Sequence, residues 1–526
     1  MSVPMAVAAS GLCDGLDRAG LLRADAGVIR VPVLTRGRLL VPEGDAVIEI
    51  VESTIDRATM RADGGVRRLL LPRVAAADLT YPDPASVRAR LAAVPFAELC
   101  CWLDAAGALL ERDAPLGARL RALVAATSDL ADPLLDAALW LNAASLRAAA
   151  VREVVDRELS IGAVAGSRFL DEWIEVDAPG WDGATGPLRA ALAAGPEAPA
   201  PRIRALPTLQ VHVTAGNAPV VAPASVLRLL ATRSGGVVKL PSGSILPGAA
   251  LAVALHAVAD AHPAARPVLD ALSLVYWQGG DAEVEQPLFD PAVFDRVVVW
   301  GAPDAVERVG GLARGIRTLT FNPRYGVSLI GRETLADSAA RHAAARLAAA
   351  DVLIWNQRAC IASLVHYVEA EDEDAADRWA AALRDALADA DRLAPAAPSP
   401  VALGQIARMR RGSLIGARWY WVGGPGREAR GAVVVAPGPF DLASHPLSRV
   451  VIVRRVARLD EAVALLHRGV STVGVHPEPR RLGLRDIIAA HGVSNVVPLG
   501  RAERGFAGMP HDGVRVLADL VEWTNG

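Results

Sequence analysis

The spacing of apolar residues changes along the chain and predicts a different kind of structure in each part. Residues 28–74 carry short apolar runs separated by glycine and aspartate, as expected of β-strands. The predicted strands of this part are Val28–Leu34, Ala46–Ile50 and Arg67–Leu71. Residues 85–160 instead space their apolar side chains three and four positions apart, which predicts a mainly helical region.

After residue 205, strand-like and helix-like runs alternate. Four strands are predicted, at Leu209–Val213, Gly235–Leu240, Leu272–Trp277 and Arg296–Trp300. Helical runs at 222–232 and 248–262 separate the first three of them. Such alternation is typical of a parallel sheet with crossover helices, which binds ligands at the carboxyl ends of its strands.

The remaining segments complete the predicted organisation. Residues 326–475 indicate a second α/β unit, with strands near Ala432–Ala436 and Arg449–Arg454 and a helix within Glu369–Leu393. Proline and glycine gather at 179–186 and 195–201, which predicts a linker. Val514–Trp523 predicts an apolar helix close to the end of the chain.

We therefore expect an α/β protein in four parts. They are an N-terminal α+β region with linker at 1–200, a Rossmann-like cofactor-binding domain at 201–325, a catalytic domain at 326–475, and a C-terminal tail at 476–526 that packs back on the body.

Composition narrows the class of protein. The chain has 526 residues, 52% of them hydrophobic and 21% charged, with a net charge of -3, which favours a globular protein and argues against nucleic acid as a partner. The longest apolar run, Leu246–Ala259, is too short to span a bilayer, and Met1–Ala9 lacks the basic start of a signal peptide. Four cysteines show neither metal-ligand nor disulfide spacing. We expect a cytoplasmic protein without a structural metal.

One cysteine lies in a distinctive context. Cys360 follows the alanine-rich helical run Ala339–Ala350 and the polar residues Asn356, Gln357 and Arg358. At a loop-to-helix junction, free N–H groups and the helix dipole stabilise a thiolate, which is the nucleophile of acyl transfer. The alternative is a buried structural cysteine.

Three further residues lie just beyond predicted strands. They are Asn217, Lys239 and Gly301, and a dinucleotide would lie there with its phosphates at helix N-termini. Lys239 is the single lysine among 55 basic residues. Either the ammonium has a specific role that arginine could not fill, or this lysine was retained by chance. The Gly-x-Gly-x-x-Gly fingerprint of dinucleotide-binding folds is missing from the sequence.

Five short motifs in this order resemble one family. They are Gly216–Pro219, Lys239, Trp300-Gly301, Asn356–Cys360 and Met509–Gly513. From about residue 205 to the C-terminus the chain is similar to the acyl-CoA reductases related to the bacterial bioluminescence fatty acid reductase. That family lies within the aldehyde dehydrogenase superfamily, whose fold has a Rossmann-like and a catalytic parallel-sheet domain.

The resemblance implies roles for individual residues. Cys360 would accept the acyl group, and Asn217 would stabilise the oxyanion together with the Cys360 N–H. Asn217 also fits a turn that tolerates the left-handed conformation. Lys239 would contact the adenosine ribose and its phosphate. The other cofactor-binding residues implied are Thr214, Ser242, Gly301 and Ala302.

Departures from the superfamily pattern are informative. Hydrolytic relatives carry a glutamate upstream of the cysteine, whereas no carboxylate occurs here between Thr320 and Arg332. An acyl-enzyme that awaits hydride must escape hydrolysis, so this absence favours reduction. His445 stands where the superfamily has a glutamate that contacts the nicotinamide ribose, and it either substitutes for that glutamate or only packs. For His511 and Asp512, an acid pair near the thiol and a structural turn both remain open.

The resemblance thus implies reduction of an acyl-CoA or acyl-carrier thioester, with a long-chain acyl group, to the aldehyde. NADPH is the expected cofactor because no carboxylate follows Lys239 before Asp260, although NADH also fits. An acyl-transferase or acyl-protein synthetase is an expected partner, and a homo-oligomer the expected assembly. Two alternatives are an aldehyde dehydrogenase running the oxidation and a catalytically silent member that scaffolds acyl transfer.

Overall fold

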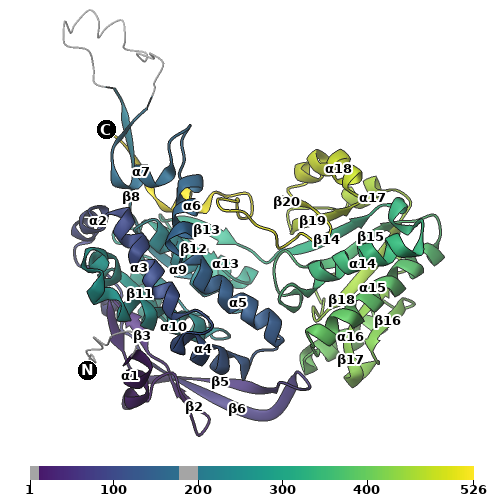
Figure 1. Ribbon diagram of the computed structural model, residues 1–526, viewed down its shortest axis with the longest axis horizontal. Coiled ribbons are helices and arrows are strands. Elements are labelled where there is room, and N and C mark those ends of the chain that lie inside the picture. The colour runs from purple at the N-terminus through teal and green to yellow at the C-terminus, as the bar shows by residue number, and fades with distance from the viewer. Residues whose placement is uncertain (1–10, 177–199) are drawn as a thin grey trace, which may run out of the picture.

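A computed structural model describes residues 11–176 and 200–526. The chain folds into two lobes, each built on a seven-stranded sheet (Figure 1). The predicted linker at 179–186 and most of its second segment lie outside the described residues, as do the N-terminal residues that bear on a signal peptide.

The first lobe contains the predicted cofactor sheet. Its strand order is β13-β12-β9-β10-β11-β3-β4. The parallel strands are β9 (Leu209–Val213), β10 (Gly235–Lys239), β11 (Leu272–Val275), β12 (Arg296–Trp300) and β13 (Arg317–Phe321). All four strands expected in this region are confirmed, and two antiparallel strands, β3 (Val33–Thr35) and β4 (Arg38–Leu40), extend the sheet beyond β11.

Helices cover this sheet. Those that follow its strands are α9 (Val221–Ala231), α10 (Ile245–Ala257), α11 (Arg266–Asp270), α12 (Ala282–Leu288) and α13 (Pro303–Leu312). The N-terminal helices are α1 (Leu12–Ala19), α2 (Pro84–Ala92), α3 (Phe96–Leu109), α4 (Pro115–Ala125), α5 (Asp132–Ser145), α6 (Ala148–Glu158) and α7 (Gly166–Asp171). Helix α10 is apolar on all sides because it lies between the sheet and α3 and α4. Its buried position explains the long apolar run of the sequence.

The second lobe holds the predicted catalytic sheet, in the order β16-β17-β18-β15-β14-β19-β20. Its strands are β14 (Tyr325–Ile330), β15 (Ser363–Glu369), β16 (Arg418–Gly423), β17 (Ala429–Val435), β18 (Val450–Val456), β19 (Val470–His476) and β20 (Asn495–Pro498). Its helices are α14 (Ser338–Leu353), α15 (Glu373–Leu393), α16 (Pro400–Arg411), α17 (Leu459–Val463) and α18 (Glu478–Ala490). The predicted boundary at 475 falls inside this sheet, because β20 pairs in parallel with β19.

A long hairpin connects the two lobes. Strands β5 (Val47–Asp56) and β6 (Arg61–Pro72) run along the base of the molecule from the first lobe to the second (Figure 1). The Arg430 guanidinium donates to the Thr59 carbonyl at 2.9 Å, and Arg61 donates to the Arg427 carbonyl. Strands β1 (Ala24–Asp25) and β2 (Val28–Arg30) complete the hairpin sheet. The single strand predicted over Val28–Leu34 is therefore wrong, since β2 and β3 belong to different sheets.

The C-terminal prediction needs a similar correction. Helix α19 spans only Val516–Leu520, and the chain then forms strand β21 (Glu522–Asn525). This strand pairs antiparallel with β8 (Arg202–Leu206), which also pairs with β7 (Ile174–Glu175), in an arm that projects from the first lobe (Figure 1). The open edge of β8 offers backbone hydrogen bonds that outweigh the local helical pattern.

Within the described residues, no single helix is both long and apolar enough to cross a membrane. Two sharply bent helix pairs, α2 with α3 and α5 with α6, meet the test of length and composition when each pair is taken together.

Candidate active site

The segment before Cys360 has an unusual backbone. Helix α14 ends at Leu353, and the next residues form a short 3-10 turn in which Trp355, Asn356 and Gln357 have φ angles of 48°, 51° and 67°. Three successive non-glycine residues in the left-handed region are strained, and such strain persists only where the surroundings enforce it.

Buried hydrogen bonds enforce this conformation. The Asn356 side-chain oxygen accepts from Arg449 Nε at 3.1 Å and Nη2 at 2.9 Å, while its amide donates to the Asp129 carbonyl at 2.9 Å. The Gln357 amide donates to the carbonyls of Ser363 and Val450, at 3.0 and 2.8 Å. The cysteine loop is thereby tied both to the sheet of its own lobe and to the first lobe.

Cys360 itself differs from the sequence-based expectation. It precedes strand β15, so no helix begins at the cysteine and no helix dipole stabilises a thiolate there. Burial, together with the Asp512 carboxylate, raises the pKa of the Cys360 thiol to about 11, against the opposing effects of Arg324 and Arg228. The thiol is therefore protonated at neutral pH, and its activation requires another group.

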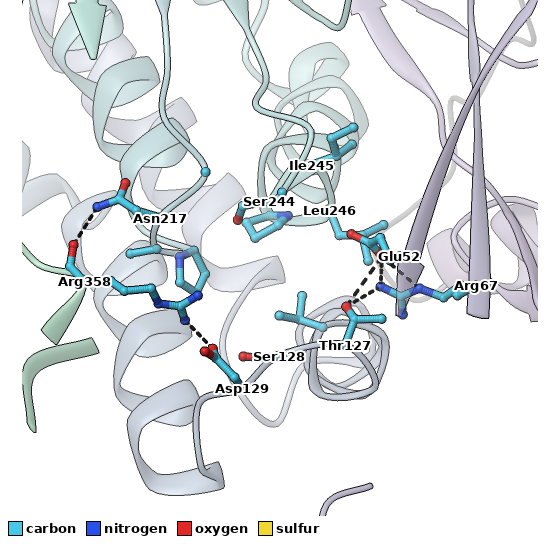
Figure 2. A pocket seen from close by; sticks show the side chains of 16 residues that line it. Glu52, Arg67, Thr127, Ser128, Asp129, Asn217, Ser244, Ile245, Leu246 and Arg358 are labelled. Carbon is cyan, nitrogen blue, oxygen red and sulfur yellow. Dashed lines mark hydrogen bonds and ion pairs between the residues drawn. The ribbon is translucent and has the colours of Figure 1, made fainter. Parts of the chain in front are cut away.

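Asn217 lies directly across from this loop. Its turn joins β9 to α9, and its side-chain amide donates to the Arg358 carbonyl at 2.9 Å (Figure 2). A carboxamide nitrogen carries two N–H groups, so a second donor remains for another acceptor. The structure thus brings the predicted oxyanion donor to within two residues of the predicted nucleophile.

A small polar pocket, open to solvent, adjoins Asn217. Its walls come from the β5–β6 hairpin, the end of α4 and the loop after it, the turns that follow β9 and β10, and Arg358 (Figure 2). Two ion pairs line it, Arg358 with Asp129 and Arg67 with Glu52, the second at 2.5 Å. Charged and hydroxyl groups therefore border the nucleophile loop on this side.

Lys239 lies at the carboxyl end of β10, as predicted. The Thr214 hydroxyl donates to the Lys239 carbonyl at 2.6 Å, which ties the ends of β9 and β10 together. The Lys239 ammonium lies 5.2 Å from the ring centre of Tyr276 and 5.5 Å from that of Trp277. Burial lowers the pKa of Lys239 to about 8, and no described residue forms an ion pair with its ammonium. A partly buried cation that forms no direct ion pair in the described part of the chain fits an anionic ligand.

The other predicted cofactor residues lie along the same rim. Ser242 is exposed just beyond β10, Gly301 directly follows β12, and Ala302 precedes the first turn of α13. A Cβ at Gly216 would lie 3.2 Å from the Gly243 backbone, so the two turns approach closely. Small residues, a helix N-terminus and the Lys239 ammonium at one sheet edge fit a dinucleotide.

Sequence reasoning missed a carboxylate near Lys239. Glu285 of α12 forms an ion pair with Arg308 of α13 and accepts a hydrogen bond from Trp277 Nε1 at 3.1 Å. Its negative charge acts on Lys239, although the second strand is followed by no acidic residue before Asp260. The tertiary fold therefore adds both an acid and a neutralising arginine to this region. No local sequence signal marks either residue.

The segment without a glutamate contributes an arginine instead. The Arg324 guanidinium, just before β14, lies 3.4 Å from the Asp512 carboxylate. His511 packs its ring edge against Trp300 and Phe321, at centroid distances of 5.1 and 5.0 Å. Burial lowers the pKa of His511 to about 3, so this ring is neutral and acts as packing. Asp512 is thus the member of the pair whose charge reaches the thiol.

His445 lies within a turn. Its Nδ1 accepts a hydrogen bond from the Leu447 backbone at 3.1 Å, and burial lowers the pKa of the ring to about 4. A neutral, enclosed ring supports the packing interpretation over substitution for a glutamate. Among the described residues, His, Cys, Asp and Glu side chains form no cluster suited to a metal ion.

The fold and the cysteine between its two sheets define an aldehyde dehydrogenase-like α/β protein. The chain superposes on NADP-dependent glyceraldehyde-3-phosphate dehydrogenase from Bacillus halodurans with a TM-score of 0.70 at 16% identity, over 95% of this chain and 99% of that one. Aldehyde dehydrogenase 21 from Physcomitrella patens gives 0.67 at 13% identity, over 94% and 97%. The profile of the acyl-CoA reductase (LuxC) family matches residues 202–523, and the chain belongs to that family.

Sequence relatives agree with this assignment. Long-chain acyl-protein thioester reductase 2 from Photobacterium leiognathi is 24% identical over 326 residues, which are 61% of this chain and 64% of the relative. The long-chain acyl-protein thioester reductase from Photorhabdus luminescens is 27% identical over 334 residues, again 61% and 64%. The matched part of the chain thus spans slightly less than two thirds of these relatives.

Proposed function

We propose that this protein reduces a long-chain acyl thioester to the aldehyde with NADPH, through a thioester on Cys360. The observation that carries the proposal is the 2.9 Å hydrogen bond from Asn217 to the Arg358 carbonyl. It brings a carboxamide donor from the first lobe to the loop that bears the thiol in the second. The names of the relatives, long-chain acyl-protein thioester reductases, support this substrate class.

Each residue has a defined task in this reaction. Cys360 attacks the acyl carbon and displaces the donor thiol, and the Asn217 amide and the Cys360 N–H stabilise the resulting oxyanion. The nicotinamide cofactor supplies a hydride when bound. A second tetrahedral oxyanion, formed when the Cys360 thioester accepts this hydride, collapses to the aldehyde and releases the Cys360 sulfur.

The direction of the reaction follows from what surrounds the thioester. Hydrolysis requires a base that activates water, and the segment from Thr320 to Arg332 offers Arg324 rather than a carboxylate. An acyl-enzyme that hydrolyses slowly persists until hydride arrives. This favours reduction over oxidation of an aldehyde to the acid, and the presence of Cys360, Asn217 and Lys239 together argues against a silent scaffold.

NADPH is the proposed cofactor, bound along the rim by Thr214, Lys239, Ser242, Gly301 and Ala302. Lys239 would face the 2′-phosphate, and the Ser242 hydroxyl lies beyond the same strand. Arg308 neutralises Glu285 through their ion pair, so this carboxylate does not repel a phosphate as an unpaired one would. Charge-assisted hydrogen bonds to phosphate contribute about 1.5–3 kcal/mol each.

The domain assignment and partners belong to the same proposal. Residues 201–325 would bind the cofactor, and the catalytic domain that starts at 326 would continue through β20 to position Cys360. The acyl donor would be acyl-CoA, an acyl carrier or the acyl-protein of an acyl-transferase or acyl-protein synthetase, and the chain would act as a homo-oligomer.

One assay tests the proposed function. NADPH consumption is followed with a panel of short-chain to long-chain acyl-CoAs, and the aldehyde is identified by mass spectrometry. Formation of one aldehyde per NADPH supports the proposal. Rapid acid formation from an aldehyde and NADP without added CoA would instead support the dehydrogenase alternative.

A further inference from the structure

The backbone of Cys360 is held by a hydroxyl from another strand of the second lobe. Ser471 of β19 donates a hydrogen bond from its Oγ to the Cys360 carbonyl at 2.5 Å. Two further oxygens lie farther from this hydroxyl, the Thr472 Oγ1 at 3.3 Å and the Tyr325 carbonyl at 3.5 Å. A hydroxyl carries a single proton, so the shortest contact defines its acceptor. Ser471 is 2% exposed, and water therefore does not compete for that proton.

An irregularity in the sheet explains how this hydroxyl leaves the regular pattern of its own strand. In the pairing of β14 with β19, Tyr325 lies opposite Val470 and Gly326 lies opposite Thr472. Ser471 is therefore an extra residue that has no partner on β14. Such bulges turn a side chain out of its regular direction and are frequent beside active sites. The extra residue lets the hydroxyl reach past the end of β14 to the chain that enters β15.

Gly326 makes room for this contact at the start of β14. A Cβ at Gly326 would overlap the Ile361 carbonyl oxygen and would lie 2.8 Å from the Ala362 carbonyl oxygen. The Gly326 N–H donates to the same Ala362 carbonyl at 2.8 Å. Any side chain at this position would push the two residues after Cys360 away from the strand. The nucleophile loop thus lies against β14, close enough for β19 to reach it.

Hydrogen bonds hold both peptide groups that flank Cys360. The Ala359 carbonyl accepts from the Ala362 N–H at 3.0 Å. Because a peptide group is planar, this bond also sets the direction of the Cys360 N–H. The bond from Ser471 holds the peptide group on the other side of the nucleophile. With both planes held, the thiol and the N–H of Cys360 keep one orientation relative to each other.

We propose that Ser471 is a positioning residue for the Cys360 nucleophile. By holding the Cys360 carbonyl, its hydroxyl keeps the thiol directed at the acyl carbon while the Cys360 N–H faces the oxyanion. The role of Ser471 is indirect, since its contact is with the backbone of the nucleophile. A misplacement of about 1 Å at a reacting centre lowers a rate by about 10²-fold, so a bond that prevents it matters for turnover. This inference rests on the proposed function and adds a residue to it.

Ser471→Ala removes this hydroxyl, and Ser471→Thr keeps it. Ser494→Ala is a matched control, because the Ser494 hydroxyl donates to the Ser471 carbonyl at 3.1 Å and not to the nucleophile. Two rates on Cys360 are measured: release of free CoA from acyl-CoA without NADPH, and alkylation by iodoacetamide at the same pH. Ser471→Ala should slow acylation about ten- to a hundredfold and leave alkylation unchanged, since alkylation needs a thiolate but no aligned oxyanion donor. Ser471→Thr and Ser494→Ala should acylate as the wild type does.

Wild-type acylation in Ser471→Ala, or acylation in Ser471→Thr as slow as in Ser471→Ala, would overturn the inference. Equal losses of acylation and alkylation would also overturn it, because they indicate general disruption of the loop. Hydrogen exchange keeps this test separate from that of the proposed function. The Ala362 amide should exchange faster in Ser471→Ala than in the wild type and Ser494→Ala, and equal exchange in all three would contradict the role of Ser471. If the wild type accepts no acyl group, the proposed function fails instead.

Discussion

The side chain of Asn217 and the carbonyl of Arg358 are joined by a 2.9 Å hydrogen bond between the two lobes. The first residue follows a strand of the cofactor sheet, and the second lies two positions before Cys360. The bond fixes one N–H of the amide and directs the carboxamide toward the thiol loop. Movement of one lobe relative to the other would therefore change the oxyanion site.

Asn217→Ala should lower kcat for thioester reduction by about 10²–10³, with a much smaller change in KM, because one oxyanion donor is lost. Steady-state kinetics with acyl-CoA as the substrate measure kcat and KM separately. Asn142→Ala is a matched control, since the Asn142 amide donates to the Pro219 carbonyl of the same turn without facing the thiol. Equal losses in both variants would indicate a structural effect on the turn.

The free enzyme should alkylate slowly at Cys360 near neutral pH. Burial raises the pKa of this thiol to about 11, so the thiolate fraction, and with it the rate, should rise roughly tenfold per pH unit from pH 7 to about pH 10. Mass-spectrometric counting of iodoacetamide adducts across pH measures the profile. A rate that is already flat above pH 7 would show a low-pKa thiolate and contradict this part of the account.

Cofactor preference should depend on Lys239. Lys239→Ala should lower kcat/KM for NADPH about ten- to a hundredfold and affect NADH less, because the charge facing the 2′-phosphate is lost. Arg308→Ala should also weaken NADPH binding, by freeing Glu285, whereas the exposed Arg314→Ala should not. A wild-type preference for NADH, or equal losses for both cofactors in Lys239→Ala, would refute the assignment.

The same residue predicts a pH effect on cofactor binding. Burial lowers the pKa of Lys239 to about 8, so its positive charge is present below that pH and is lost as the pH rises through it. The KM for NADPH should therefore increase above about pH 8. Lys239→Arg keeps its charge at these pH values and should flatten the profile. A KM that rises equally in both proteins would exclude Lys239 as the cause.

The strained turn before Cys360 should respond to substitution at Asn356. Asn356→Ala removes hydrogen bonds to Arg449 and Asp129 and leaves a left-handed residue, so the thermal midpoint should fall. The buried hydrogen bonds are worth about 1–3 kcal/mol in total. Asn356→Gly loses the same bonds but accepts the backbone conformation and should be more stable than the alanine variant by about 1 kcal/mol. An unchanged midpoint in both would contradict the role of Asn356.

Much of the fold followed from sequence because its strands are local, buried and bounded by turns. Strands β9 and β12 match their predicted ranges, and the alternation of strands with helices correctly predicted a parallel sheet. The C-terminal helix prediction was wrong because β21 pairs with β8, more than three hundred residues earlier in the chain. The spacing of apolar residues within a short segment cannot predict a strand partner so distant in the sequence.

The site divides in the same way. Cys360, Asn217 and Lys239 stood in recognisable motifs, and the structure places them at the junction of the lobes or at the sheet rim. Glu285, Arg308 and the Asp512–Arg324 pair depend on distant segments meeting in space, and sequence spacing carries no trace of those contacts. The predicted thiolate failed for a related reason, since the strand after Cys360 replaces the helix that its composition indicated.

The central claim is a covalent acyl-enzyme on Cys360. The most direct measurement is peptide mass spectrometry after incubation with a long-chain acyl-CoA in the absence of NADPH. The account predicts one acyl group on Cys360 that hydroxylamine releases, and no adduct in Cys360→Ala. An acyl group on Cys100 or Cys101 instead, or a wild-type protein that stays unmodified while it reduces the thioester, would contradict it.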